Sequence, residues 1–261
     1  MILEIKSLSI TYRGKEEYVE ALKGVSFGLN EGEILGVIGE SGSGKSTLAL
    51  SVLNLLPFDS KKQGRIIFED KNIFSLKDKE LEFLRGNRIG LIFQEPASVF
   101  NPVLSIGYQF KEVLENRLGI KNKQEQQKII LNSLNKVRLG DTGRILKSYP
   151  HQLSGGQLQR IAIAIAIAQK PAILIADEPT SSLDVTIESQ IIYLFKELQK
   201  ELNLTVIFIT HNLDLIKVLA DRTVVLYKGE VKEIRDKDEL FASPQNDYTK
   251  SLIASFKELE A

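Results

Sequence analysis

Short runs of apolar residues, some alternating with polar ones, mark the N-terminal part of the chain and predict β-strands. The run Ile34–Ile38 is continuously apolar, which is typical of a buried strand. The predicted strands cover residues 3–12, 24–29, 34–38, 64–69 and 88–93, and the predicted helices cover 45–56 and 76–84. Strands that alternate with helices in this way predict an α/β fold with a mostly parallel sheet.

The pattern changes after Gln94, where prolines interrupt the chain and residues 104–138 become helical and mostly polar. We therefore predict that residues 95–169 form a helical subdomain inserted into an α/β core made of residues 1–94 and 170–261. Strand patterns return at 172–176 and 205–210, with a helix over 185–201, a hairpin from 222–227 and 230–234, and a helical tail from 246.

One stretch is ambiguous, because Ile161 to Ala168 alternates isoleucine and alanine with the period of a strand. It continues without a break from Gln157, and Pro171 follows closely, so residues 155–169 equally suit a helix. A helix with isoleucine at every second position is apolar on all sides and therefore buried. We predict a helix here.

Composition and charge narrow the function classes. The chain has 261 residues, 43% of them apolar and 26% charged, and its formal net charge is zero. This balance excludes a disordered chain and argues against nucleic-acid binding, which usually requires a strongly basic domain. The sequence contains no cysteine, which excludes disulfides and thiolate metal sites. We expect neither a secretory signal at its start nor a membrane span, since the longest apolar run, Ile161–Ala168, is far shorter than about 20 residues.

A phosphate-binding pattern lies between the predicted strand 34–38 and the predicted helix that starts at Lys45. Residues 39–46 read Gly-Glu-Ser-Gly-Ser-Gly-Lys-Ser, which fits the P-loop. Its glycines let successive N–H groups point into one concavity at a helix N-terminus. Lys45 would reach the β- and γ-phosphates and the Ser46 hydroxyl would ligate Mg²⁺; the alternative is a Gly/Ser turn that only caps a helix.

Two carboxylates end the predicted strand 172–176. In a parallel sheet, residues at this end face the crevice where ligands bind. Asp177 is placed to hold Mg²⁺, and Glu178 to orient or deprotonate the attacking water of a phosphoryl transfer. The alternative is a strand that ends in a solvated turn.

A second candidate anion site is the segment Leu153-Ser154-Gly155-Gly156-Gln157. A serine N-cap followed by two glycines leaves a bare helix start with free N–H groups. An ordinary helix cap would look the same. In its place after a P-loop and before Asp177, however, the segment resembles the signature of the ATP-binding-cassette (ABC) ATPases.

This resemblance covers essentially the whole chain, with each motif present once, and implies a P-loop NTPase (RecA-like) α/β core with an N-terminal antiparallel β region and an inserted α-helical subdomain. Tyr12 matches the family's adenine-stacking position, although a half-buried sheet tyrosine is the alternative. Gln94 matches the glutamine that approaches Mg²⁺ and the lytic water. His211 matches the histidine that contacts the γ-phosphate, although a lone histidine is more often structural. Asp184 matches the acid of the loop, residues 179–184, that crosses to the partner subunit.

The family resemblance also implies ATP and Mg²⁺ as cofactors and two cassettes that face each other head to tail around ATP. Glu178, His211 and Gln94 would be catalytic, and Ser46, Gln94 and Asp177 would bind Mg²⁺. The residues implied in nucleotide binding are Tyr12, Gly39, Ser41, Gly42, Ser43, Gly44, Lys45, Ser46, Thr47, Ser154, Gly155, Gly156, Gln157 and Asp184.

A narrower resemblance, to the peptide/nickel importer branch, rests on residues 93–96, 100–107 and 149–152 and on Pro244, Asp247-Tyr248-Thr249 and Leu252. Many members of this branch carry a cysteine-rich tail that holds an iron–sulfur cluster, and this sequence, without cysteine, departs from that pattern. The resemblance implies an importer ATPase for peptides or for nickel and other metal chelates. Its implied partners are a second cassette, two transmembrane permeases and, indirectly, an extracytoplasmic solute-binding protein. Its implied location is peripheral, on the cytoplasmic face of the cell membrane.

Two other classes remain as alternatives. One is an ABC ATPase outside transport, in DNA repair, chromosome maintenance or iron–sulfur assembly. The repair type usually carries long coiled coils, for which the predicted insert is too short, and the importer-like segments weigh against an assembly factor. The other is a P-loop nucleotide kinase, which leaves residues 153–157 and His211 unexplained.

Overall fold

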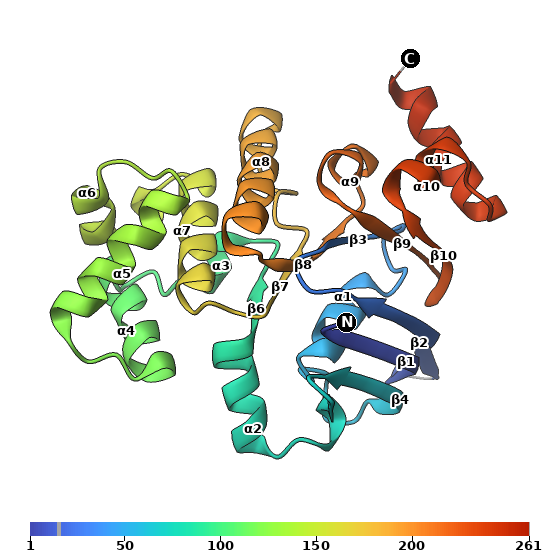
Figure 1. The fold of residues 1–261 in the computed structure, drawn as a ribbon, viewed down its shortest axis with the longest axis horizontal. Helices are drawn as coiled ribbons and strands as arrows, with labels where there is room; N and C mark the ends of the chain where they lie inside the picture. Colours follow the sequence, from blue (N-terminus) through green and yellow to red (C-terminus); the bar gives the residue numbers. More distant parts are fainter. Residues whose placement is uncertain (15–16, 261) are drawn as a thin grey trace. The chain divides into compact units, whose positions relative to one another are not determined.

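The computed structural model describes residues 1–14 and 17–260, which form two compact units (Figure 1). Unit 1 consists of Met1–Leu81 and the described part of Thr205–Ala261, and unit 2 consists of Glu82–Leu204. The predicted α/β class is confirmed, with antiparallel and parallel strands accompanied by helices. The limits 95 and 169 of the predicted helical subdomain stay a prediction.

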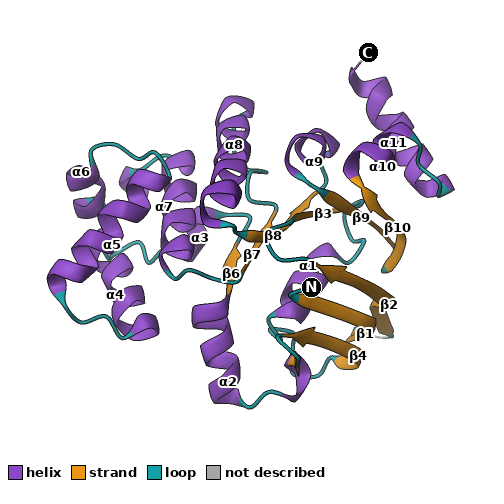
Figure 2. Ribbon diagram, in the orientation of Figure 1, coloured by secondary structure: helices purple, strands orange, loops and turns teal. Residues whose placement is uncertain are grey.

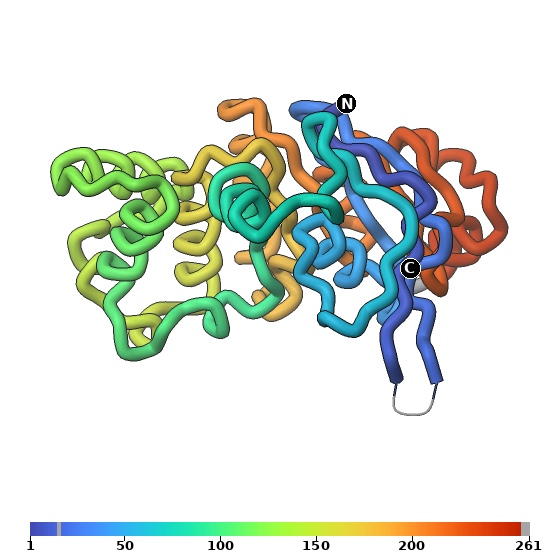
Figure 3. Tube along the Cα trace, turned by 90° about the horizontal axis from the view of Figure 1, so that it is seen from below, coloured from blue at the N-terminus to red at the C-terminus, as the bar shows by residue number. Residues whose placement is uncertain are grey.

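An antiparallel sheet opens unit 1, with strand order β2-β1-β4-β5. Its strands are β1 (Leu3–Arg13), β2 (Tyr18–Leu29), β4 (Lys61–Phe68) and β5 (Lys71–Asn72). Leu3, Ile5, Leu8 and Ile10 of β1 are each at most 1% exposed, so this strand supplies a large share of the sheet's apolar face. β2 begins earlier than residue 24, the predicted start, because β1 pairs with it as far as Arg13 and Tyr18. Figure 3 shows these two strands side by side (blue).

Four further strands of unit 1 place chain segments that are far apart in sequence next to one another. They are β3 (Ile34–Ile38), β8 (Thr205–Thr210), β9 (Arg222–Tyr227) and β10 (Glu230–Asp236). β3 pairs in parallel with β8 and with β9, and β9 and β10 form the predicted antiparallel hairpin. Ile38 pairs with both Thr210 and Val225, so all three parallel strands end at one edge. All five residues of β3 are buried, as predicted from its apolar run.

Short helices complete unit 1. They are α1 (Lys45–Val52), the 3₁₀ turn η1 (Ile73–Ser75), α9 (Leu213–Leu219), α10 (Lys237–Ala242) and α11 (Asp247–Glu260); α2 (Asp78–Phe83) spans the division at Leu81. The helix predicted over 45–56 extends too far at its C-terminal end. α1 ends at Val52, and Asn54 takes a left-handed conformation (φ 50°) that cannot continue a helix.

A buried carboxylate attaches the segment before α11 to β10. Glu233 is 8% exposed and accepts hydrogen bonds from the N–H groups of Gln245 (2.9 Å) and Asn246 (3.0 Å). Burial acts to raise the pKa of Glu233, but these two N–H groups favour the charged form, and the net effect lowers the pKa from its ordinary value of 4.5. The ionised Glu233 therefore stabilises the C-terminal segment.

We expect Glu233→Gln to lower the free energy of unfolding by about 1–3 kcal/mol, because an amide cannot accept from both N–H groups. A carboxylate whose pKa is lowered in the folded state contributes its full stabilisation of the fold at pH values above its ordinary pKa. This contribution is lost as the pH falls through the lower pKa of the folded state. The stability difference between the parent chain and the variant should therefore shrink below pH 4.5, in urea titrations at several pH values. Glu31→Gln, at an exposed site, is the control.

Unit 2 is mostly helical around one pair of parallel strands (Figure 2). The strands are β6 (Ile89–Ile92) and β7 (Ile173–Asp177), and Ile92 pairs with Ala176. Its helices are α3 (Pro96–Val99), α4 (Ile106–Leu118), α5 (Lys123–Lys136), α6 (Thr142–Lys147), α7 (Gly155–Ala168) and α8 (Val185–Leu202), with a π-helical turn η2 (Leu84–Arg88) and a 3₁₀ turn η3 (Pro150–Gln152). The polar stretch predicted as helical over 104–138 is thus two helices, divided where Gly119 takes a left-handed conformation.

The ambiguous isoleucine–alanine stretch is a helix, as predicted, because it lies inside unit 2 rather than at the edge of a sheet. Ile161 and Ile163 are fully buried in α7, and Ala164 and Ala166 between the isoleucines are buried as well. Burial on several sides removes the need for one polar face. Sequence periodicity and structure differ here because packing, not alternation, decides the conformation.

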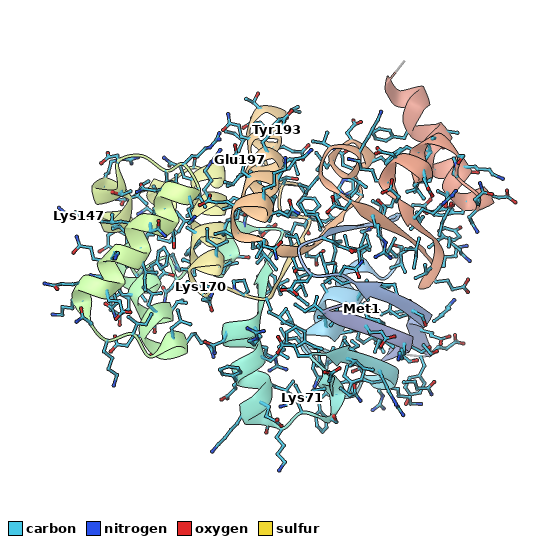
Figure 4. All side chains as sticks on the ribbon, in the orientation of Figure 1. Met1, Lys71, Lys147, Lys170, Tyr193 and Glu197 are labelled. Atoms are coloured by element: carbon cyan, nitrogen blue, oxygen red, sulfur yellow. The ribbon has the colours of Figure 1, made fainter. Side chains whose placement is uncertain are left out.

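Polar contacts join α8 to the end of α5 in unit 2. Lys136 pairs with Glu201 and Arg138 pairs with Glu197, and Figure 4 labels Glu197 and Tyr193 along α8. Arg160 of α7 donates to Gln190 of α8 at 3.0 Å. α8 is therefore held to the helices that precede it in sequence, in agreement with its place in unit 2.

Candidate functional site

The P-loop pattern forms a turn between the buried strand β3 and helix α1, as predicted. Lys45 is the first residue of α1 and is only 6% exposed. Its ammonium group donates to the carbonyl oxygens of Gly39 (2.7 Å) and Glu40 (2.9 Å). No side chain caps the N-terminus of this eight-residue helix. The loop thus combines a buried cation with a helix start that lacks a side-chain cap, which together suit an anion.

Two glycines of the loop are required by close backbone neighbours. A Cβ atom on Gly39 would lie 2.1 Å from the carbonyl oxygen of Leu226, and one on Gly44, whose φ is 107°, would lie 2.6 Å from that of Ala21. Gly42, with a φ of 76°, has no atom within 4 Å of where its Cβ would be. The Ser43 hydroxyl is buried and has no hydrogen-bond partner among the described residues. An open glycine and an orphaned hydroxyl in a tightly bounded loop fit a phosphate chain as ligand.

The aromatic residue predicted to stack on a base is connected directly to the helix that follows the P-loop. The Tyr12 hydroxyl of β1 donates to the Thr47 hydroxyl of α1 at 3.2 Å. Tyr12 is half-buried, whereas Ser41 and Ser46 are exposed. The structure therefore brings Tyr12 together with the predicted nucleotide-binding residue Thr47.

His211 lies at the same edge of the strands as the P-loop. It follows Thr210, the last residue of β8, and Thr210 pairs with Ile38, the residue before Gly39. His211 is exposed, while every residue of β8 is buried. Parallel pairing thus explains how a histidine distant in sequence reaches the neighbourhood of Gly39.

In unit 2, the carboxyl ends of β6 and β7 carry three of the predicted residues. Ile92 of β6 pairs with Ala176 of β7, so Gln94 and the pair Asp177 and Glu178 follow adjacent strand ends. Gln94 is exposed, and both carboxylates are half-buried. Glu178 has a φ of 47°, a left-handed conformation that turns the chain away from β7. The backbone carbonyl of Glu178 accepts from the N–H (3.3 Å) and hydroxyl (3.2 Å) groups of Ser181, which stabilises this turn.

Asp184 has a structural role that is visible in unit 2. Its carboxylate accepts from the N–H of Ile187 at 3.0 Å and so caps the N-terminus of α8. This contact accounts for the aspartate locally. A role toward a partner subunit stays a prediction.

The segment 153–157 starts helix α7 with a reciprocal cap. The Ser154 hydroxyl accepts from the N–H of Gln157 (3.3 Å), and the Gln157 side-chain oxygen accepts from the N–H of Ser154 (3.1 Å). This capping box leaves the N–H groups of Gly155 and Gly156 outside it. A Cβ atom on Gly156 would lie 2.7 Å from the Cγ2 atom of Ile187, so glycine is required by packing against α8.

Sequence reasoning missed two features of this site. One is the structural use of Gln157, which the spacing of Ser154 and Gln157 could have indicated as a capping box. The other is the turn between β9 and β10, where the N–H of Gly229 donates to the carbonyl of Ser43 at 3.0 Å. The hairpin was predicted, but nothing in its sequence points to the P-loop.

The features of unit 1 define a class: an α/β protein with a P-loop built to bind the phosphates of a nucleotide. A family model described as "ABC transporter" matches residues 22–181. The chain belongs to this family, and it is an ATPase whose hydrolysis is coupled to transport.

Curated relatives match the chain along almost its full length. The dipeptide transport ATP-binding protein DppD of Bacillus subtilis is 43% identical over 99% of this chain and 78% of its own length. The oligopeptide transport ATP-binding protein OppD of the same organism is 41% identical over 100% of this chain and 73% of its own length.

Solved structures show the same fold. The dimeric ATP-binding cassette MJ0796 in a post-hydrolysis state with ADP and Pi superposes with a TM-score of 0.79 at 33% identity, covering 90% of this chain and 98% of that one. The cassette cbiO1 from Clostridium perfringens, part of the complex cbiONQ, has a TM-score of 0.80 at 31% identity, covering 93% of this chain and 91% of that one. Among the described helices, none is long and apolar enough to cross a lipid bilayer.

Proposed function

We propose that the chain is the ATP-binding and ATP-hydrolysing motor subunit of an importer that takes up peptides. The observation that carries this proposal is the P-loop, with Lys45 buried against loop carbonyls and an orphaned Ser43 hydroxyl. The relatives' names, which specify dipeptide and oligopeptide transport, support the solute class. Nickel or another metal chelate is the second solute class of the branch that the sequence resembles.

In this proposal the residues of unit 1 bind Mg-ATP. Tyr12 stacks on the base, Lys45 and the backbone N–H groups of residues 39–47 bind the phosphates, and the Ser46 hydroxyl ligates Mg²⁺. The described residues contain no group of three or more histidine or acidic side chains arranged to hold a metal. In this proposal Ser46, Asp177 and Gln94 would hold Mg²⁺ together with oxygen atoms of the nucleotide. Mg²⁺ would supply neutralisation of the charge that develops on the phosphates.

Hydrolysis is proposed to depend on the residues at the strand ends. Glu178 orients the attacking water and accepts its proton, and Gln94 helps to position this water. His211 donates a hydrogen bond to the γ-phosphate, which its exposed position after β8 allows.

Two copies of the cassette, or this chain and a homologous one, are proposed to face each other with ATP between them. Ser154, Gly155 and Gly156 at the start of α7 would reach the γ-phosphate held by the partner's P-loop. This arrangement is supported by the exposure of Ser154 and Gly155 and by the dimeric cassettes among the structural neighbours. Loss of the γ-phosphate would remove these contacts and weaken closure.

The proposed contact with two permeases lies on unit 2, after β6. Several apolar or aromatic side chains within one short stretch of sequence are exposed there: Phe93 (44%), Val99 (50%), Val103 (75%) and Tyr108 (56%). Docking to permeases would cover them and would hold the chain at the cytoplasmic face of the cell membrane. A solute-binding protein outside the membrane would act only through the permeases.

Reconstitution tests this function. The chain would be co-expressed with the permease and binding-protein genes that neighbour its own gene, purified as a complex, and placed in liposomes that contain ATP. We expect ATP-dependent uptake of a labelled tripeptide and none of ⁶³Ni²⁺ or its histidine chelate. Uptake of nickel alone would replace the peptide assignment, and a chain that hydrolyses ATP without any co-purifying permease would contradict the transport role.

A further inference from the structure

Backbone groups from three segments of unit 1 meet beside the P-loop. The N–H of Gly229, in the turn between β9 and β10, donates to the Ser43 carbonyl at 3.0 Å. The Gly229 carbonyl accepts in turn from the N–H of Lys23 in β2 at 2.8 Å. A Cβ atom on Gly229 would lie 2.7 Å from the Ala21 carbonyl oxygen, and one on Gly44 would lie 2.6 Å from the same oxygen. The β9–β10 turn is therefore fixed between β2 and the P-loop, with no room for a side chain at Gly229.

The hydrogen bond from Gly229 fixes the direction of one peptide group of the P-loop. In a trans peptide, the C=O and N–H groups point in opposite directions, and the described residues contain no cis peptide bond. Because the Ser43 carbonyl points to Gly229, the N–H of Gly44, in the same peptide, points away from the turn. N–H groups of a P-loop bind phosphates when they converge on one concavity. The turn thus sets the orientation of a candidate phosphate-binding amide.

Leu226, near the end of β9, gives this strand a second contact with the loop. Its carbonyl oxygen lies 2.1 Å from where a Cβ atom of Gly39 would be, and its Cδ2 atom lies 3.4 Å from the corresponding position at Gly44. The Leu226 side chain is fully buried. Successive side chains of a strand point to opposite faces, so the next residue, Tyr227, points away from the P-loop.

Tyr248 of the C-terminal helix α11 packs on Tyr227. The two rings stack with their centroids 4.0 Å apart and their planes at 26°. Such a stack stabilises a contact beyond the apolar area that it buries. The segment before α11 is held to β10 separately, through the Glu233 carboxylate. The C-terminal segment is therefore attached at two points to the hairpin whose turn contacts the P-loop.

We propose that the stack of Tyr227 and Tyr248 positions the P-loop for phosphate binding: it holds the β9–β10 turn so that Gly229 keeps the Gly44 N–H directed at the bound phosphates. This inference rests on the proposed ATP-binding role of the P-loop. Both tyrosines are positioning residues, since they act through the turn and not on the ligand. Without the stack, the turn and the loop gain conformational freedom, and nucleotide binding then has to order them at a cost in affinity.

Two substitutions of Tyr248 test the proposal. Tyr248→Leu removes the ring but keeps an apolar side chain, whereas Tyr248→Phe keeps the ring. Binding of Mg-ADP would be measured by titration calorimetry at a temperature at which no variant has begun to unfold. We expect the Kd for ADP to rise about 3- to 10-fold in Tyr248→Leu, the effect of losing one aromatic pair, and to stay unchanged in Tyr248→Phe. Tyr193→Leu, at a tyrosine 58% exposed on α8, is the matched control and should leave the Kd unchanged.

A double-mutant cycle with Tyr227→Leu identifies the stack as the cause. Either single substitution removes the same contact, so the variant that carries both Tyr227→Leu and Tyr248→Leu should bind ADP no more weakly than the weaker of the two single variants. Hydrogen exchange without nucleotide reports on the turn itself. We expect faster exchange at the Gly229 amide in both leucine variants and no change in Tyr248→Phe, because a loosened turn protects this N–H group less.

The outcomes separate this inference from the function on which it rests. If the parent chain binds ADP and Tyr248→Leu binds it equally well, the positioning role is wrong while the nucleotide site stands. If Tyr248→Phe weakens binding as much as Tyr248→Leu, or if the effects of the two leucine substitutions add in free energy, the stack is not the cause and the proposal is overturned. If the parent chain binds no ADP, the proposed function fails, and this inference fails with it.

Discussion

Replacing Glu178 by glutamine is expected to slow ATP hydrolysis by about two to four orders of magnitude, the usual contribution of a general base. The substitution keeps the size and the polarity of the side chain but removes its ability to accept a proton from water. The backbone carbonyl of Glu178, which holds the turn after β7 through Ser181, is retained in the variant. ATP binding should therefore persist, and the variant should accumulate in the ATP-bound, dimeric form.

Phosphate release and ATP binding must be measured on the same preparation to test this expectation. Glu115→Gln, an exposed glutamate on α4, makes the same chemical change away from the strand ends and should retain full activity. If Glu178→Gln hydrolyses ATP at a rate within a factor of about three of the parent chain, the general base is another group. A variant that also loses ATP binding would instead place Glu178 among the binding residues.

The sequence predicted most of unit 1's nucleotide-binding elements because each rests on local chemistry. A five-residue apolar run, a glycine-rich turn and a helix that starts at lysine are adjacent in the chain, so β3, the P-loop and α1 need no long-range information. The positions of Gln94, Asp177 and His211 at strand ends were predicted equally well, because each directly follows an apolar run.

Long-range contacts were beyond the reach of sequence patterns. The hydrogen bond from the Gly229 N–H to the Ser43 carbonyl joins two segments that are far apart in sequence, and nothing in either segment indicates that they are in contact. The stacking of Tyr248 on Tyr227 likewise arises only in the folded chain. The ends of α1 and β2 were missed for a related reason. A left-handed residue stops the helix, and pairing with β1 lengthens the strand beyond its apolar part.

The alternating stretch in α7 shows how tertiary context overrides a periodic signal. The period of two predicts a strand, yet burial on several sides makes alternation irrelevant, and the capping box at Ser154 fixes where the helix begins. A start signal and a stop signal, Ser154 and Pro171, were therefore better guides than the pattern between them. The same capping box places Gly155 at the first position of the helix.

Gly155→Asp is expected to abolish ATP-driven dimerisation without unfolding the chain. An acidic residue in the first turn stabilises a helix by about 0.3–1 kcal/mol, so the Tm of the monomer should hold or rise. Its Cβ atom would lie 3.4 Å from the Cδ2 atom of Leu183, a contact that a small shift accommodates. In the proposed dimer, however, the new carboxylate would face the partner's γ-phosphate. Since a like-charge contact costs several kcal/mol, we expect dimerisation to weaken at least about 100-fold.

Gly155→Asn separates charge from size, because asparagine has the shape of aspartate without its charge. Sedimentation velocity with ATP, in the Glu178→Gln background, should show dimers for Gly155→Asn and monomers for Gly155→Asp. If both variants stay monomeric, crowding at the start of α7, not charge, limits the interface. If Gly155→Asp still dimerises with ATP, no phosphate approaches this helix end, and the head-to-tail arrangement is wrong. The comparison thus tests whether the amides outside the capping box serve the nucleotide of a second subunit.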